Sequence, residues 1–337
     1  MKQKTLLDEE NRLELLSQLG DPLEILNRVI KWEKFRSVLN QGSRKEDTGK
    51  GGRPSYDVVM MFKILVLQRL YNLSDDQTEY QINDRMSFMR FLGINLCEKV
   101  PDAKTIWKFK NDLAETETVD KLFCMFDEHL ENKGLISHKG TIVDATFVDA
   151  PRQRNSRDEN KKIKNGVIPE EWENKSKLAQ KDIDADWTKK NGERHFGYKD
   201  HVKCDADSKL ITNYSVTSAS VHDSQRCLVF IGQEDEVLYA DSAYSGKPIA
   251  LALPENCKNQ ICEKGYRNSP LTSEQKMNNR RKSRIRCRIE QIFGFMTGAM
   301  HGITIRSIGI TRAWMNIGIT NLVYNFCRYS YLKRASA

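Results

Sequence analysis

The sequence lacks the patterns of several protein classes. Its eight cysteines are scattered and no two form a CxxC pair, so neither a structural zinc site nor a disulfide framework is indicated. No apolar run approaches the ~18 residues of a membrane-spanning helix, and the first residues, MKQKTLLDEENRLELL, have no apolar core of a signal peptide. We therefore expect a soluble protein of the cytoplasm, associated with the nucleoid and with no membrane partner.

What the sequence does contain is enough apolar material for a folded core and an excess of positive charge. With 39% hydrophobic residues, its 337 residues suffice for one large domain and a smaller one. Lys and Arg number 54 against 46 Asp and Glu, a formal charge of +8. This excess of cations favours a polyanionic partner.

Helical periodicity fills the amino-terminal part of the chain. We predict helices over 1–48, a basic linker at Gly49 to Pro54, and a helical DNA-binding domain over 49–135. Ser74 and Gln77 have the spacing of a capping box, and a later helix beginning at Asp102 carries Lys108 and Lys110. Short helices with tight turns suit DNA binding, and a bundle that only packs against the remainder of the protein is equally compatible.

Past residue 138 the pattern changes to strands and helices in alternation, which predicts an α/β domain over 138–333. The domain is expected to hold a mixed sheet flanked by helices. A polar, charged segment at 151–194 predicts a long mobile insertion. Strands are predicted at 141–148, 196–204, 210–217, 236–240 and 260–263, and helices at 220–231, 272–300 and 311–332.

Three carboxylates in this domain stand in unusual positions. Asp144 lies within an apolar strand, where aspartate is costly to bury, and Asp241 ends the strand VLYAD, where ligands commonly bind. Glu290 lies on a predicted helix beside its apolar stripe. Each alone is ordinary, as a turn residue or a solvated side chain. Together they are typical of a magnesium site for phosphodiester chemistry, because Mg²⁺ prefers oxygen ligands.

The helix that carries Glu290 is strongly basic. A charge run on a helix is usually a solvated face, but these cations directly precede the predicted metal ligand and suit a phosphate backbone. Arg286 stands one turn before Glu290, where it is positioned to orient the glutamate or to grip the scissile phosphate. The cations predicted to contact DNA are Arg281, Lys282, Arg284, Arg286, Lys199, Lys108 and Lys110.

The motifs GTIVDAT, LYADSAY and RIRCRIEQIFGFM, in this order, resemble the DDE transposases of bacterial insertion sequences, most closely the IS five group of the IS four superfamily. The segments HFGYKDHV and SASVHDSQ fit the same pattern, and the resemblance covers roughly Gly51 to Tyr329. It implies an RNase H-like fold, Asp144, Asp241 and Glu290 as catalytic metal ligands, and transposition of the encoding element.

Two positions depart from the wider superfamily, which often has Tyr and Lys where this chain has Ser283 and Thr297. The missing Lys predicts a weaker contact to the DNA ends. Three further residues have ambiguous roles: His222 and Asp223 suit either the site or a local cap, and Tyr244 suits either bound DNA or the core. His201, like Lys199, suits either DNA or a strand edge.

The predicted function is a transposase that binds the terminal inverted repeats of its own element in double-stranded DNA. It would hydrolyse phosphodiester bonds and join the freed 3′-hydroxyls to target DNA, with Mg²⁺ or in its place Mn²⁺, as a homodimer or larger assembly. One alternative is an RNase H-like nuclease or resolvase that cuts without joining. Another is a catalytically dead relic that only occupies inverted-repeat DNA.

Overall fold

The computed structural model describes residues 8–43, 55–172, 174–190 and 192–335, which form two compact units. The first unit comprises residues 1–125 and 322–337, and the second comprises residues 126–321. The expected linker at Gly49 to Pro54, and with it the expected boundary between residues 48 and 49, lies outside the described residues.

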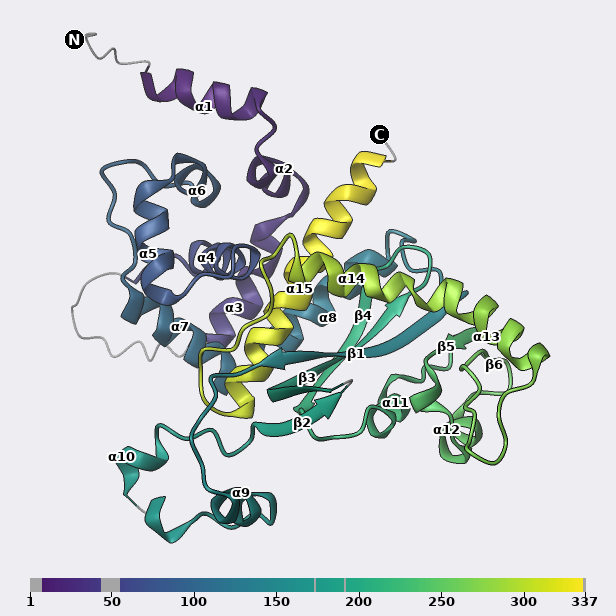
Figure 1. Cartoon of the computed structure of the whole chain (residues 1–337). Coiled ribbons are helices and arrows are strands. Elements are labelled where there is room, and N and C mark those ends of the chain that lie inside the picture. The colour runs from purple at the N-terminus through teal and green to yellow at the C-terminus, as the bar shows by residue number, and fades with distance from the viewer. Residues whose placement is uncertain (1–7, 44–54, 173, 191, 336–337) are drawn as a thin grey trace. The chain divides into compact units, whose positions relative to one another are not determined.

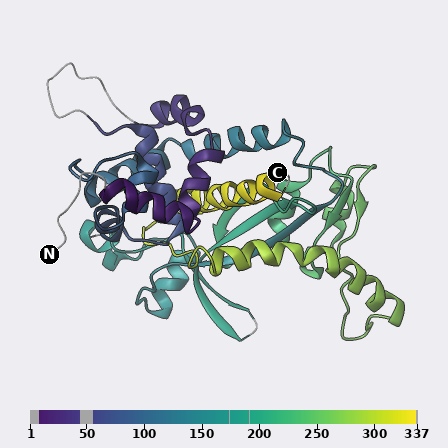
Figure 2. The ribbon, with the colours of Figure 1, turned by 90° about the horizontal axis from the view of Figure 1, so that it is seen from above.

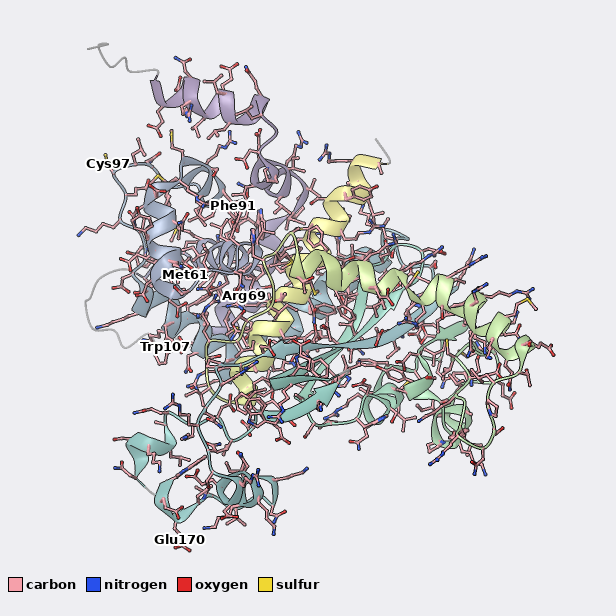
Figure 3. All side chains as sticks on the ribbon, viewed as in Figure 1. Met61, Arg69, Phe91, Cys97, Trp107 and Glu170 are labelled. Atoms are coloured by element: carbon pink, nitrogen blue, oxygen red, sulfur yellow. The ribbon has the colours of Figure 1, made fainter. Side chains whose placement is uncertain are left out.

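The first unit is helical, and several of its helices begin at capping residues. Ser74 and Gln77 form the expected capping box, and the side chain of Asp102 accepts from the Thr105 amide. Buried aromatic rings, among them Trp32 and Phe62, pack edge to face at its core, which includes the labelled Met61 and Phe91 (Figure 3). The elements are α1 (Asp8–Gln18), α2 (Pro22–Val29), η1 (Trp32–Phe35), α3 (Arg36–Gly42), α4 (Val58–Leu70), α5 (Asp75–Asp84), α6 (Met86–Leu92), α7 (Ala103–Glu115) and the first part of α8 (Thr118–Glu131).

The second unit is built on a mixed six-stranded sheet (Figure 1). Along the sheet the order is β4-β3-β1-β5-β6, and β2 pairs with the first part of β3. The pairs β1·β3, β3·β4 and β2·β3 are antiparallel, whereas β1·β5 and β5·β6 are parallel. The strands are β1 (Thr141–Asp149), β2 (Asp186–Lys190), β3 (Glu193–Asp205), β4 (Ile211–Ser218), β5 (Val237–Tyr239) and β6 (Lys258–Asn259).

The polar insertion at 151–194 contains regular structure. It holds α9 (Arg157–Lys164), η2 (Glu170–Trp172), α10 (Lys175–Leu178) and β2, which was not predicted. Asp182 anchors the segment to the sheet, because its buried carboxylate accepts from the Tyr198 hydroxyl at 2.8 Å and 2.7 Å.

The helices that follow the sheet differ in one respect from the prediction. A single helix was expected over 272–300, but the structure has α13 (Ser273–Arg286) and α14 (Arg288–Thr297), which meet at Cys287. The expected capping box at Thr272 and Gln275 is present. The remaining elements are α11 (Ser224–Phe230), η3 (Ser242–Tyr244), α12 (Lys247–Ala252) and α15 (Ile310–Ala335), the last of which runs on into the first unit.

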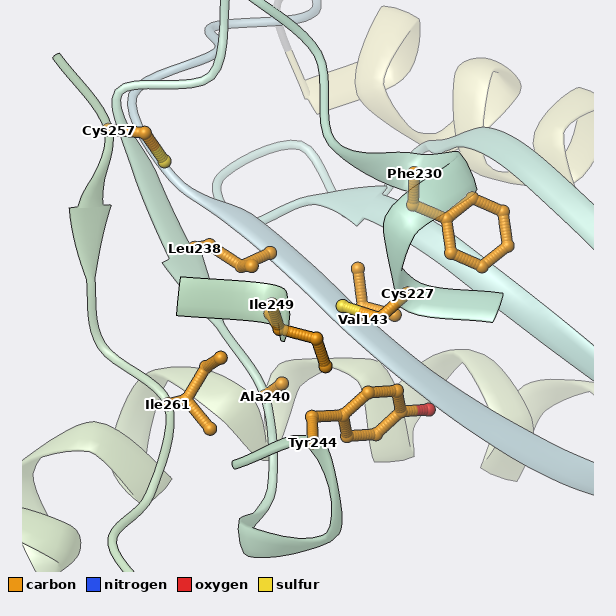
Figure 4. Close-up of a cluster of buried hydrophobic side chains, with 9 residues drawn as sticks. All are labelled: Val143, Cys227, Phe230, Leu238, Ala240, Tyr244, Ile249, Cys257 and Ile261. Carbon is orange, nitrogen blue, oxygen red and sulfur yellow. The ribbon is translucent and has the colours of Figure 1, made fainter. Parts of the chain in front are cut away.

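A buried apolar cluster supports β1 and β5 from one face of the sheet (Figure 4). Val143 of β1 and Leu238 of β5 meet side chains from α11 and α12, including Cys227 and Ile249. Tyr244, which follows Asp241 along the chain, fills the same cluster. This packing fixes the two strands that carry the predicted acidic residues. Among the described helices, none is long and apolar enough to cross a membrane.

Candidate active site

Asp144 lies in the middle of β1, a central strand of the sheet. Its neighbours Ile142 and Val143 are fully buried, and its own side chain is only 14% exposed. The carboxylate accepts from the Ala145 amide at 2.8 Å and from an Arg286 nitrogen at 2.9 Å. A charged group in such a place requires compensation from charged partners.

Asp241 lies two residues beyond the end of the neighbouring parallel strand β5, where continuing the register places it opposite Asp144. The register pairs Ile142 with Tyr239, and two further residues along each strand bring Asp144 opposite Asp241. Neighbouring strands are about 4.8 Å apart. Asp241 caps η3 by accepting from the Ala243 amide at 2.8 Å, so the end of the strand and the turn orient its carboxylate together.

Glu290 reaches the site from α14. This helix contacts β1 and buries Ile289, Ile292 and Met296. Glu290 stands beside these apolar positions with its side chain 58% exposed, and its carboxylate accepts from Arg286 at 2.7 Å. Arg286 therefore bridges the strand carboxylate and the helix carboxylate, and does so across the break at Cys287.

The electrostatics of Asp144 reflect this crowding. Burial raises the pKa of Asp144 to about 6, and the negative charge of Asp241 adds to the increase. The Ala145 amide and the cations Arg286 and Lys190 lower the pKa of Asp144 in opposition. The influence of Asp241 on this pKa agrees with the register of β1 and β5, which directs both residues to the same end of the two strands.

These carboxylates fit a divalent cation. All three offer hard oxygen ligands, which Mg²⁺ and Mn²⁺ prefer. The raised pKa of Asp144 means that a cation bound there would relieve an existing electrostatic penalty. Asp144 and Asp241 would hold the metal from the sheet and Glu290 from the helix, with Arg286 as their cationic partner in the metal-free protein.

Comparison with known proteins identifies the family. A model described as "Transposase DDE domain" matches residues 136–326, more than half of the chain, and one described as "Transposase domain (DUF772)" matches residues 10–112. This chain belongs to the DDE transposase family. One solved structure, a piggyBac transposase synaptic complex with hairpin DNA, shares 12% identity at a TM-score of 0.47 over 94% of this chain and 76% of that chain.

The transposase accordingly has a helical amino-terminal region followed by an RNase H-like catalytic fold, as the sequence predicted. A DDE domain is a polynucleotidyl transferase domain, so the expected class of enzyme is also confirmed. The match to the IS five group and the assignment of individual site residues stay predictions.

A second group of possible metal ligands lies at the opposite end of the same strands. Atoms of His138, Glu234 and Asp235 lie within 4.8 Å of one another. The ammonium of Lys203 already lies 2.8 Å from the Asp235 carboxylate, which the Thr141 hydroxyl also contacts. This group is therefore an ion-pair network of the transposase, and we assign no metal to it.

The cations predicted to contact DNA occupy different environments. Arg281 and Arg284 are exposed on α13, and Lys108 is exposed on α7 next to the half-exposed Trp107 (Figure 3). Lys282 donates to the Ile261 carbonyl at 2.9 Å. Two others are engaged elsewhere in the protein: the ammonium of Lys110 pairs with Asp75, and that of Lys199 is buried and pairs with Asp223.

The ambiguous residues are also placed. Asp223 binds Lys199 at 2.7 Å, and His222 contacts the Ser224 hydroxyl at 2.8 Å in a local turn. His201 is fully buried, and burial lowers its pKa to about 4. Tyr244 is buried, and burial together with the charge of Asp144 raises its pKa. Its hydroxyl has no hydrogen-bond partner within the described residues, and Figure 4 shows it directed out of the apolar cluster.

One residue near the site was not singled out from the sequence. Lys190, at the end of β2, is exposed and lowers the pKa of Asp144. Because β2 lies in the polar insertion and was not predicted, nothing in the sequence placed this lysine near the catalytic strand.

Proposed function

We propose that this transposase, a member of the IS five group, binds the terminal inverted repeats of its own element and catalyses both cutting and joining of double-stranded DNA. The observation that supports the proposal is the register of the parallel strands β1 and β5, which brings Asp144 opposite Asp241 just beyond β5, with Glu290 joined to Asp144 through Arg286. Arg286 contacts two of these carboxylates, and the charge of the third, Asp241, contributes to the raised pKa of Arg286.

The reaction has two chemically matched steps. In the first, water attacks a phosphorus atom at the transposon end, and the bond to the 3′-oxygen breaks to leave a free 3′-hydroxyl. In the second, that hydroxyl attacks a phosphodiester of the target, forming a new bond and releasing a target 3′-hydroxyl. No covalent bond to the protein is needed.

We assign Asp144, Asp241 and Glu290 as catalytic residues that hold Mg²⁺, with Mn²⁺ as a substitute. When bound, the metal would activate the attacking oxygen and stabilise the charge on the phosphate. The protein's own contribution is positional: the β1·β5 register fixes two carboxylates, and the packing of α14 on β1 fixes the third. When the metal replaces Arg286 as the partner of Asp144 and Glu290, the arginine would be free to contact the phosphate.

DNA binding is assigned to both units of the chain. We propose 49–135 as a helical DNA-binding domain that uses Lys108 on the exposed side of α7, with 1–48 as a helical segment before it and 138–333 as the catalytic domain. In the catalytic domain, we propose that Arg281 and Arg284 contact DNA from the exposed side of α13, the helix that precedes Glu290. Joining two transposon ends favours a homodimer or larger assembly.

The test is cleavage and strand transfer on a labelled duplex that carries the element's inverted repeat, with Mg²⁺ and a supercoiled target. The proposal predicts nicked ends followed by covalently joined product. Cutting without joining supports the nuclease alternative, and binding of the repeat without cutting supports the relic. Failure to bind, cut or join overturns the proposed function.

A further inference from the structure

The β2–β3 hairpin carries exposed cations on both of its strands. Lys189 and Arg194 are paired directly across the two strands, and both are exposed. Within the described part of the chain neither forms an ion pair. Like charges in directly opposite positions destabilise a sheet, so this pair is costly unless an anion lies against it.

Two more cations lie on or beside the hairpin. Lys190 follows Lys189 at the end of β2, and its ammonium lies 5.6 Å from the centre of the Phe147 ring. The exposed guanidinium of Arg152 lies 5.8 Å over Trp187, itself 36% exposed. An arginine stacked on an aromatic ring keeps its N–H edge available for a phosphate.

The hairpin is held close to the catalytic strand. His195 of β3 stacks on Phe147 at 4.3 Å, and Phe147 stands three residues after Asp144 on β1. Gly197 lets β3 lie close to the end of β1, because a Cβ at this position would lie 2.3 Å from the Val148 carbonyl oxygen. The φ of Gly197 is +148°, which other residues rarely adopt.

Figure 2 shows the hairpin extending beyond the rest of the sheet. An extended, positively charged element rooted next to a phosphodiester site has the shape and charge to lie along a duplex. Side chains of Lys and Arg that contact phosphates fix the position of DNA without reading its sequence.

We propose that the β2–β3 hairpin, with Arg152 stacked on its Trp187, is an arm that contacts the sugar–phosphate backbone of the DNA bound at Asp144 through Lys189, Lys190, Arg194 and Arg152. This inference rests on the proposed function and adds a contact surface to it. The arm positions DNA of any sequence, and its residues take no part in the chemical step.

The test compares DNA binding by the full-length protein and by the charge-reversed variant K189E/R194E. The probes are a labelled duplex with the inverted repeat and a random duplex of equal length, titrated in EDTA over a range of salt concentrations. Loss of two phosphate contacts is expected to weaken binding of both probes roughly tenfold and to reduce the salt slope by about 2. The variant K189R/R194K, which keeps both charges, should bind like the unaltered protein.

The matched control is K133E/K139E, which reverses two exposed lysines that precede β1, away from the end of the strand where the hairpin lies. Thermal melting of each variant reports its folding. Unchanged affinity and salt slope in K189E/R194E would contradict the proposed arm, and so would an equal loss of affinity in the control. Either result leaves the proposed function intact if the unaltered protein still cuts and joins DNA. If the unaltered protein binds neither duplex, the arm and the proposed function fall together.

Discussion

At the scale of single residues, Asp144 carries a charge that its surroundings oppose. Its pKa is raised to about 6 from the ordinary value of 3.8, so ionising it destabilises the metal-free fold above pH 6. Below pH 3.8 the carboxyl group is neutral in both the folded and unfolded states, and this cost disappears.

Asp144→Asn should therefore stabilise the metal-free protein at pH 7.5. The expected gain is about 1–3 kcal/mol in the free energy of unfolding, because the amide never ionises. Urea melts in EDTA at pH 7.5 and pH 4.5 measure it, and the gain should shrink at the lower pH. A variant less stable than the unaltered protein at pH 7.5 contradicts the electrostatic account.

Arg286 is the cation that contacts two of the three proposed metal ligands. It donates to Asp144 at 2.9 Å and to Glu290 at 2.7 Å. Arg286→Gln should bind Mn²⁺ more tightly than the unaltered protein in the absence of DNA at pH 8, by roughly tenfold, since a competing positive charge is gone. Calorimetric titration measures the change.

The control is Arg284→Gln, which removes a neighbouring charge exposed on the same helix. Equal or weaker Mn²⁺ binding by Arg286→Gln would show that the arginine does not compete with the metal. Equal strengthening in both variants would show a general charge effect in place of a local one.

At the scale of elements, the strands that carry the site were well predicted from the sequence. Apolar runs at 141–148 and 236–240 predicted β1 and β5 to within one residue at each end. By contrast, β2 has the polar sequence DWTKK, and its place is set by pairing with β3, which local sequence does not encode.

For the helices too, a local signal was predictable from the sequence, whereas a feature set by tertiary packing was not. The capping box at Thr272 fixed the start of α13 from the sequence. The break at Cys287 has no proline or glycine to announce it, so a continuous helix was expected over 272–300. The contact of Arg286 with Glu290 persists across the break, which is why the predicted geometry of these two side chains still appears.

Gly197 tests how β3 is positioned against β1. Gly197→Ala should cost more than about 2 kcal/mol of stability, because the new methyl group meets the Val148 carbonyl at 2.3 Å and the Ala150 nitrogen at 2.7 Å. Gly294→Ala is the matched control, since α14 leaves open space at that glycine and helix propensity favours alanine by about 1 kcal/mol. Denaturant melts that rank the two variants in the reverse order contradict the backbone assignment.

At the scale of the whole molecule, the formal charge of +8 and the two matched transposase segments describe an enzyme that acts on DNA. Two transposon ends must be held together for joining, so we expect the protein with inverted-repeat duplex to form a complex containing two or more copies of each. Mass photometry at nanomolar concentrations measures its mass. A complex of one protein with one duplex that still completes strand transfer argues against an obligate assembly.

The central claim is that Asp144, Asp241 and Glu290 together form the catalytic metal site. The most direct measurement is single-turnover cleavage and joining of an inverted-repeat duplex in Mg²⁺ by Asp144→Asn, Asp241→Asn and Glu290→Gln, with the exposed Glu236→Gln as control. We predict that each of the three loses about a thousandfold or more in rate while folding and DNA binding persist, and that the control keeps its rate. Full activity in any one of the three variants would contradict the assignment.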